Sequence, residues 1–145
     1  MNILISACLL GAPCRYDGTG KLEPALERLR AQGHTLVPVC PEVLGGLPTP
    51  RPPAERQPDG RVVTREGGDV TAQYCRGAEE ALRLADLLGC EAALLKERSP
   101  SCGSGTVYDG TFTGTLTAGD GVTAALLRAH GIPVYGESRI EELLD

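Results

Sequence analysis

The stretch NILISACLLG, residues 2–11, joins a short apolar run to a cysteine and a glycine. The run from Asn2 to Ala7 is typical of a strand buried within a parallel sheet. Segments with helical spacing separate three further apolar runs, at residues 35–39, 91–96 and 132–135. Since right-handed crossovers join parallel strands, this alternation predicts an α/β fold. We expect a mostly parallel sheet with helices on both faces, a Rossmann-like arrangement of three layers.

Apolar spacing and terminal residues mark the helices between these strands. We expect helices at residues 22–32, 70–88 and 119–130, each followed by a glycine that favours helix termination. Asp69 is suited to cap the second helix, and Ser138 with Glu141 forms a capping-box pattern that opens a last helix. The 145 residues have the length of one ordinary domain, so we expect a single domain over residues 1–145.

Two long segments without regular spacing interrupt this pattern. Residues 41–68 are rich in proline and contain one short strand pattern at 61–64. Residues 97–117 contain a hairpin signal around Tyr108–Asp109–Gly110–Thr111. Long segments of this kind are usually functional or disordered, and prolines stiffen the first one. We therefore expect an ordered active-site loop in residues 41–68.

Composition narrows the class of protein. The net charge is −5 and no dense stripe of Lys or Arg is present, which disfavours binding to nucleic acid. One Phe, four Tyr and no Trp argue against a base-stacking platform. No apolar run is long enough to span a bilayer, and the N-terminus lacks a basic leader, so we expect a cytoplasmic protein. Neither a GxGxxG motif nor a Walker loop follows the first strand, which disfavours a standard nucleotide site.

Four of the six cysteines lie where a ligand site is expected. Cys8, Cys40 and Cys102 each follow a predicted strand, and the carboxyl ends of parallel strands share one edge where ligands bind. Cys14 lies in the loop after Cys8 and belongs to the same edge. Three thiolates without an obvious fourth protein ligand favour an iron–sulfur cluster or metal ion with one open position. The spacing is not that of a CxxC zinc site, so redox thiols and packed core cysteines remain alternatives.

The remaining cysteines, Cys75 and Cys90, are interpreted as small buried hydrophobic residues. Cys75 falls in line with Ala78, Leu82 and Ala85 on one face of a predicted helix. Cys90 lies between the end of that helix and the next strand. We expect both side chains in the core.

Four blocks of this sequence resemble the thiouracil desulfidase family of small bacterial proteins. They are SACLLGAPCRYDG (6–18), PVCPEVLGGLPTPRPPAE (38–55), GGDVT (67–71) and LKERSPSCGSG (95–105). Long blocks in this order are more specific than any single cysteine. The resemblance implies a [4Fe-4S] enzyme that removes sulfur from thiolated pyrimidines without net redox chemistry. It also implies three protein thiolates and a fourth iron that is free to bind substrate.

The same resemblance implies roles for individual residues. The expected cluster ligands are Cys8, Cys40 and Cys102, with Cys14 as a substitute ligand. The expected catalytic carboxylate and hydroxyl are Glu42 and Ser99, with Ser101 as the second choice for the hydroxyl.

The expected partner is a small thiolated heterocycle such as 2-thiouracil. Arg15, Asp17 and Arg51 are candidate substrate-binding residues. The alternative for these three, together with Glu55, is an ion-pair network that only shapes the pocket. No pattern in the sequence indicates an oligomeric state.

Two other functions remain as alternatives. One is a sulfur-transfer cluster protein related to tRNA thiolation, which would call for a basic surface that this acidic chain does not show. The other is a zinc or thiol-redox module without catalysis.

Overall fold

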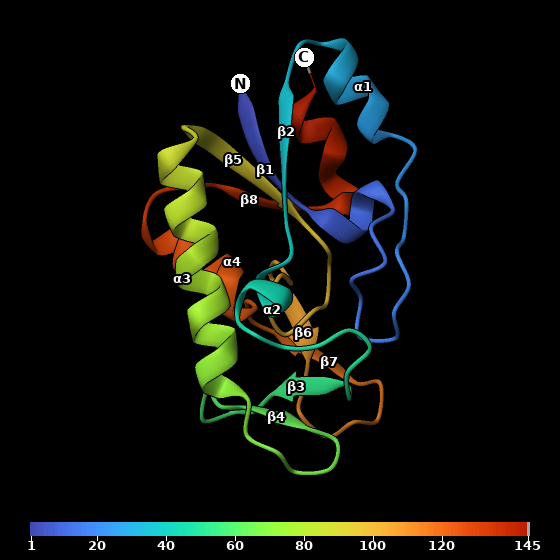
Figure 1. Cartoon of the computed structure of the whole chain (residues 1–145), viewed down its shortest axis with the longest axis vertical. Helices are drawn as coiled ribbons and strands as arrows, with labels where there is room; N and C mark the ends of the chain where they lie inside the picture. Colours follow the sequence, from blue (N-terminus) through green and yellow to red (C-terminus); the bar gives the residue numbers. More distant parts are fainter. Residues whose placement is uncertain (145) are drawn as a thin grey trace.

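In the computed structural model, which describes residues 1–144, four parallel strands form the central sheet (Figure 1). Their order across the sheet is β2-β1-β5-β8, and each neighbouring pair is parallel. The strands are β1 (Asn2–Ser6), β2 (Thr35–Val39), β5 (Cys90–Leu95) and β8 (Val134–Gly136). The predicted α/β fold with a parallel sheet is therefore confirmed.

A hydrophobic core lies on each face of the sheet. Because side chains alternate along a strand, Leu4 contributes to one core while Ile3 and Ile5 contribute to the other. Helices α3 and α4 cover the first face, and α1 with the 3-10 helix η2 covers the second (Figure 1). Their bounds are α1 (Leu26–Ala31), α3 (Thr71–Leu87), α4 (Val122–Ala129) and η2 (Glu137–Leu143). This is the three-layer arrangement that the sequence predicts.

Short elements gather beyond the carboxyl ends of β1, β2 and β5 (Figure 1). They are η1 (Ala7–Leu10), α2 (Pro41–Leu44), β3 (Ala54–Arg56), β4 (Val62–Thr64), β6 (Thr106–Tyr108) and β7 (Leu116–Ala118). β3 pairs with β4 and β6 with β7 in two antiparallel hairpins, and β3 lies against β6. The predicted strand at 61–64 and the predicted hairpin around Tyr108 are therefore confirmed.

α1, α3 and α4 all lie within their predicted ranges. α4 begins three residues after its predicted start, at Val122, and α1 begins four residues after its own, at Leu26. The N–H groups of Lys21 and Glu23 bond instead to the carbonyls of Cys8 and Leu9, at 2.8 and 2.9 Å, so this segment runs beside η1. None of the helices within residues 1–144 combines the length and apolarity needed to cross a membrane.

Neither predicted helix cap forms as expected. Asp69 accepts the N–H of Thr71 at 2.9 Å, but it lies one residue before the N-cap, Val70, so it does not occupy the predicted cap position. The capping box of Ser138 and Glu141 is wrong. The Ser138 hydroxyl instead donates to Glu97 Oε2 at 2.6 Å, which joins η2 to the segment after β5.

Cys75 is exposed, which corrects its predicted place in the core, whereas Cys90 is buried as predicted. The buried stripe of α3 consists of Tyr74, Gly77, Ala78, Ala81 and Ala85. Cys75 lies one residue, or about 100° around the helix, from the start of this stripe. Its thiol therefore faces outward.

Helices α2 and α3 approach until their backbones touch. A Cβ atom on Gly77 would lie 1.8 Å from the carbonyl oxygen of Pro41, and one on Gly45 would lie 2.0 Å from that of Gln73. Only glycine permits this approach. α2 is thereby fixed against α3 immediately beside the carboxyl edge of the sheet.

Replacement of Gly77 by alanine tests this packing through the sign of the change in stability. In an unconstrained helix interior, Gly→Ala stabilises by about 1 kcal/mol. We expect Gly77→Ala to destabilise the protein by about 2 kcal/mol, because the added methyl group collides with Pro41. Chemical denaturation of the two proteins measures the difference, and a gain in stability would contradict the backbone contact.

Candidate functional site

A cavity of about 630 Å³ opens beyond the carboxyl ends of the central strands. Small-molecule sites typically hold roughly 300–1,000 Å³, so this space suits a small ligand. Its walls come from η1, the start of α2, the loop after β5 and residues of both hairpins. Four cysteines line it: Cys8, Cys14, Cys40 and Cys102.

Different segments carry these cysteines to the cavity. Cys8 lies in η1 directly after β1, where its carbonyl accepts the N–H groups of Gly11 and Lys21 at 3.1 and 2.8 Å. Cys40 lies between β2 and α2, and Pro41 begins the helix. The structure thus brings to one space three cysteines that follow different strands.

Ser99 shapes the loop that carries Cys102. The Ser99 hydroxyl oxygen accepts the N–H groups of Ser101 and Cys102, both at 3.1 Å. The Ser99 carbonyl accepts the N–H of Gly103 at 2.9 Å, and a Cβ on Gly103 would lie 2.8 Å from that carbonyl oxygen. The tight turn therefore requires glycine after Cys102.

Burial raises the pKa of three of the cavity thiols, those of Cys8, Cys14 and Cys102. Burial, and then the neighbouring Cys40, raise the pKa of Cys8 to about 11 and that of Cys14 to about 12. Burial, and then the charge of Glu42, also raise the pKa of Cys102. Any metal group that binds these cysteines as thiolates must displace their protons.

The donor set of the cavity fits an iron–sulfur cluster, because such clusters are held by cysteine thiolates. No three His, Cys, Asp or Glu side chains in residues 1–144 lie close enough together to hold a single metal ion. In a cluster each thiolate binds a different iron, so the sulfurs need to border a common space rather than meet at one point. The four cysteines border such a space.

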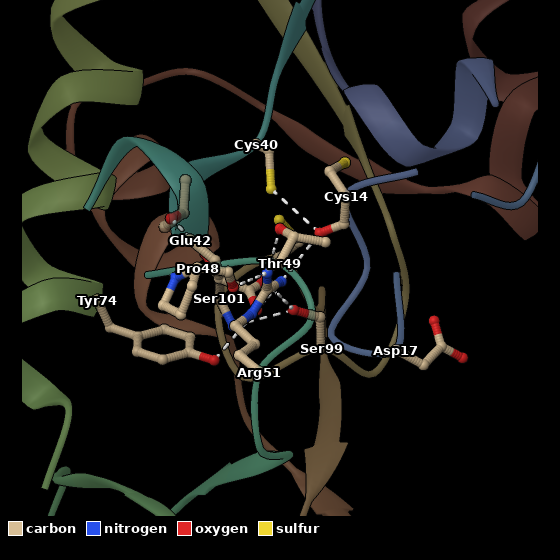
Figure 2. Close-up of polar contacts among 12 residues, drawn as sticks. Cys14, Asp17, Cys40, Glu42, Pro48, Thr49, Arg51, Tyr74, Ser99 and Ser101 are labelled. Carbon is tan, nitrogen blue, oxygen red and sulfur yellow. Dashed lines mark hydrogen bonds and ion pairs between the residues drawn. The ribbon is translucent and has the colours of Figure 1, made fainter. Parts of the chain in front are cut away.

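The carboxylate of Glu42 faces the same cavity, and its two oxygens have different partners (Figure 2). Oε2 accepts hydrogen bonds from Arg51 Nη2 at 2.8 Å, Arg51 Nε at 3.2 Å and the Tyr74 hydroxyl at 3.1 Å. Oε1 faces Ser99, whose hydroxyl oxygen lies 3.5 Å away. Burial, and then the charge of Glu42, raise the pKa of Tyr74, so its hydroxyl remains a donor. One carboxylate oxygen is therefore occupied and the other is directed at a serine hydroxyl.

The hydrogen-bond donors of Arg51, a predicted substrate-binding residue, all bond to other residues of the protein. Its side chain is 4% exposed and forms an ion pair with Glu42. Nη1 donates to the Pro48 carbonyl and the Thr49 hydroxyl, both at 3.2 Å, and Nη2 donates to the Cys14 carbonyl at 3.1 Å (Figure 2). Arg51 lines the cavity, but its donors all bond within the protein, which favours the structural alternative over substrate binding.

Two predicted site residues, Asp17 and Ser101, lie outside the cavity wall. Asp17 accepts the N–H of Thr19 at 3.0 Å and its hydroxyl at 2.6 Å, within an exposed turn. Ser101 is fully buried, and its hydroxyl lies 2.8 Å from that of Thr123. Arg15 does line the cavity, and its side chain makes no ion pair with any residue from 1 to 144.

The predicted ion-pair network with Glu55 is not formed. The buried Glu55 carboxylate accepts the backbone N–H groups of Gly110 at 2.9 Å and Phe112 at 3.2 Å instead. A different ion pair, between Lys96 and Glu137 at 2.8 Å, lies in the cavity wall.

The cavity combines four thiols with a carboxylate and a hydroxyl. The family model for 2-thiouracil desulfurase matches residues 3–139. The chain belongs to the 2-thiouracil desulfurase family. The family resemblance that four sequence blocks predict is therefore confirmed.

Two relatives of this desulfurase-family chain span nearly its whole length. YbbK of Bacillus subtilis (strain 168), described as uncharacterized, is 42% identical over 151 residues, which cover 98% of this chain and 99% of YbbK. A solved structure of the [4Fe-4S]-dependent thiouracil desulfidase TudS is 56% identical, with a TM-score of 0.91. That match covers 98% of this chain and 94% of the TudS chain.

Two cavity residues of this desulfurase-family chain, Tyr74 and Phe112, belong to no motif that marks them as functional. A signal for Tyr74 exists in its spacing to Gly77, Ala78 and Ala81, because these residues share the buried stripe of α3. Phe112 is the only Phe in the chain and lies in an otherwise polar hairpin tip. A large apolar side chain in a polar turn is the signal that could have found it.

Loss of the Arg51 guanidinium tests its structural role. Arg51→Met keeps the side-chain volume but leaves the Glu42 carboxylate without its cation, so we expect a loss of about 3 kcal/mol in the free energy of unfolding. Arg83→Met is the matched control, since Arg83 pairs with Glu80 on an exposed helix surface, where we expect a change below about 0.5 kcal/mol. Equal, small effects in urea denaturation would refute the structural role.

Proposed function

We propose that this protein is an iron–sulfur enzyme that removes sulfur from thiolated pyrimidines of the 2-thiouracil type. The observation that carries the proposal is that four cysteine thiols line the same cavity as the Glu42–Ser99 pair. Membership of the 2-thiouracil desulfurase family and the likeness to TudS support it.

We propose Cys8, Cys40 and Cys102 as the ligands of a [4Fe-4S] cluster, with Cys14 as the substitute. Cys8 and Cys102 are buried, and each of the three follows a different strand of the sheet. When bound, the cluster supplies a soft Lewis-acidic iron with one free position, which suits a thiocarbonyl sulfur better than a carbonyl oxygen.

The net reaction is a hydrolysis without electron transfer. The carbon–sulfur bond of the substrate breaks, a bond from the same carbon to the water oxygen forms, and the sulfur leaves with the two water protons as hydrogen sulfide. The ring keeps oxygen in place of sulfur. No oxidant or reductant is required.

Glu42 is proposed as the general base. Its Oε2 is occupied by Arg51 and Tyr74, so the lone pairs of Oε1 remain to accept a proton. The Ser99 oxygen accepts two backbone N–H groups, which directs its own hydrogen toward Oε1. Glu42 can therefore deprotonate water directly or through Ser99 as a relay.

Removal of single cysteines tests the ligand set. After anaerobic reconstitution with iron and sulfide, we expect the wild-type protein to be brown and to hold about four irons per chain. Cys8→Ser, Cys40→Ser and Cys102→Ser are expected to lose most of this iron, while Cys14→Ser keeps it. Cys75→Ser is the control, because Cys75 is exposed and outside the cavity.

Two results would contradict this ligand set. Iron loss in Cys14→Ser with full iron in one of the other three variants would make Cys14 the ligand. A colourless wild-type protein that holds one zinc would favour the zinc or thiol-redox module instead.

Turnover of 2-thiouracil tests the reaction and the base. The reconstituted enzyme is expected to release uracil and sulfide in equal amounts, measured by chromatography and a sulfide assay. Glu42→Gln keeps the shape of the side chain but loses the basic carboxylate, so kcat should fall at least ~100-fold with unchanged iron content. Glu80→Gln, on the exposed face of α3, is the control and should keep the full rate. A full rate in Glu42→Gln would exclude Glu42 as the base.

A further inference from the structure

Four of the five aromatic residues in this chain line one cavity. The sequence contains one Phe, four Tyr and no Trp. The cavity is lined by Tyr16, Tyr74, Tyr108 and Phe112, and only Tyr135 lies elsewhere. Composition alone argues against a stacking platform, but the fold concentrates these scarce rings at the site. Flat aromatic surfaces of this kind recognise flat heterocyclic rings.

Phe112 is presented by the hairpin that β6 and β7 form, residues 106–118. Its backbone is left-handed, with φ of 57°, a conformation that non-glycine residues rarely adopt. Such strained residues persist only where surrounding contacts hold them, and they cluster at functional sites. The position of the Phe112 ring is therefore maintained at an energetic cost.

The contact that maintains it comes from Glu55 in β3. The Glu55 carboxylate is buried, and its Oε1 accepts the N–H groups of both Gly110 and Phe112, at 2.9 and 3.2 Å. Gln57, the residue directly after β3, donates from Nε2 to the Gly110 carbonyl at 3.2 Å. Glu55 takes part in no ion pair within the described residues, so its buried charge is satisfied by the hairpin backbone.

A cation lies over the face of the Phe112 ring. The guanidinium carbon of Arg65 lies 5.9 Å from the centroid of the Phe112 ring, within the range of a cation–π contact. Arg65 also lines the cavity. Two of the other three rings are less suited to stacking, because Tyr74 is buried and bonded to Glu42, and Tyr16 is 44% exposed.

We propose that Phe112 is the residue on which the substrate ring stacks, and that Glu55 is a positioning residue that holds Phe112 over the cavity. The inference rests on the proposed function for the identity of the substrate, a thiolated pyrimidine. The β6–β7 hairpin then selects the planar ring of the substrate, and the cysteine side of the cavity receives its sulfur atom.

The test separates ring binding from chemistry. For the reconstituted holoenzyme, KM and kcat for 2-thiouracil are measured together with binding of 5-fluorouracil by fluorine NMR. 5-Fluorouracil is planar and has no sulfur, so its affinity reports binding of the ring without a contribution from sulfur. Phe112→Gly removes the ring and relieves the left-handed backbone, because glycine adopts this conformation freely.

We expect Phe112→Gly to raise KM and weaken 5-fluorouracil binding by the same factor, about tenfold, with kcat within about twofold of wild type. Phe112→Tyr keeps the aromatic face and should restore both values. Glu55→Ala should act like Phe112→Gly, whereas Glu55→Gln keeps an acceptor oxygen for the two N–H groups and should resemble wild type. Thermal unfolding of each variant shows whether the fold is retained.

Failure of this inference differs from failure of the proposed function. Unchanged KM and unchanged 5-fluorouracil affinity in Phe112→Gly overturn the stacking role while turnover by the wild type upholds the function. A loss of kcat alone overturns it as well. If the wild type does not convert 2-thiouracil but binds 5-fluorouracil in a Phe112-dependent way, the function is wrong and the stacking site stands.

Discussion

The buried guanidinium of Arg51 is the contact on which the geometry of the site depends. It bonds to Glu42 in α2, to the Pro48 and Thr49 segment and to the carbonyl of Cys14. A buried cation is tolerated only when its donors are satisfied, so each of these segments is constrained by the others. The cysteine loop and the carboxylate therefore cannot move independently. This links the part of the site that would hold a metal group to the part that would move a proton.

Backbone contacts reinforce the same geometry on the other side of Glu42. Gly77 and Gly45 let α2 and α3 touch, which brings the hydroxyl of Tyr74 to the Glu42 carboxylate. The loop of Cys102 is fixed in a similar way, since a Cβ on Gly121 would lie 2.4 Å from the carbonyl carbon of Ser101. Because glycine lacks a Cβ atom, it lets two backbones come into contact at these positions. Its effect here is closer packing rather than greater flexibility. The site is rigid because backbones, and not only side chains, pack against one another.

The cavity wall combines residues from two groups of segments. Cysteine thiols and the Glu42–Ser99 pair come from the segments that follow the parallel strands, whereas Phe112 and Tyr108 come from the β6–β7 hairpin. Glu55 joins the two hairpins through backbone N–H groups. Thiols and aromatic rings in one cavity suit the flat, sulfur-bearing ring of the proposed reaction.

The sequence by itself determined the alternation of strands and helices, the cysteines after strand ends and the family, because these depend on local spacing and on contiguous motifs. It did not determine which side chains face the cavity. Arg15 lines it and Asp17 does not; Ser99 meets Glu42 while Ser101 is buried against Thr123. The two members of each pair lie two positions apart in an irregular loop, where no fixed period sets the direction of a side chain. Only the tertiary contacts of the turn decide that direction, so only the folded structure could separate the members of each pair.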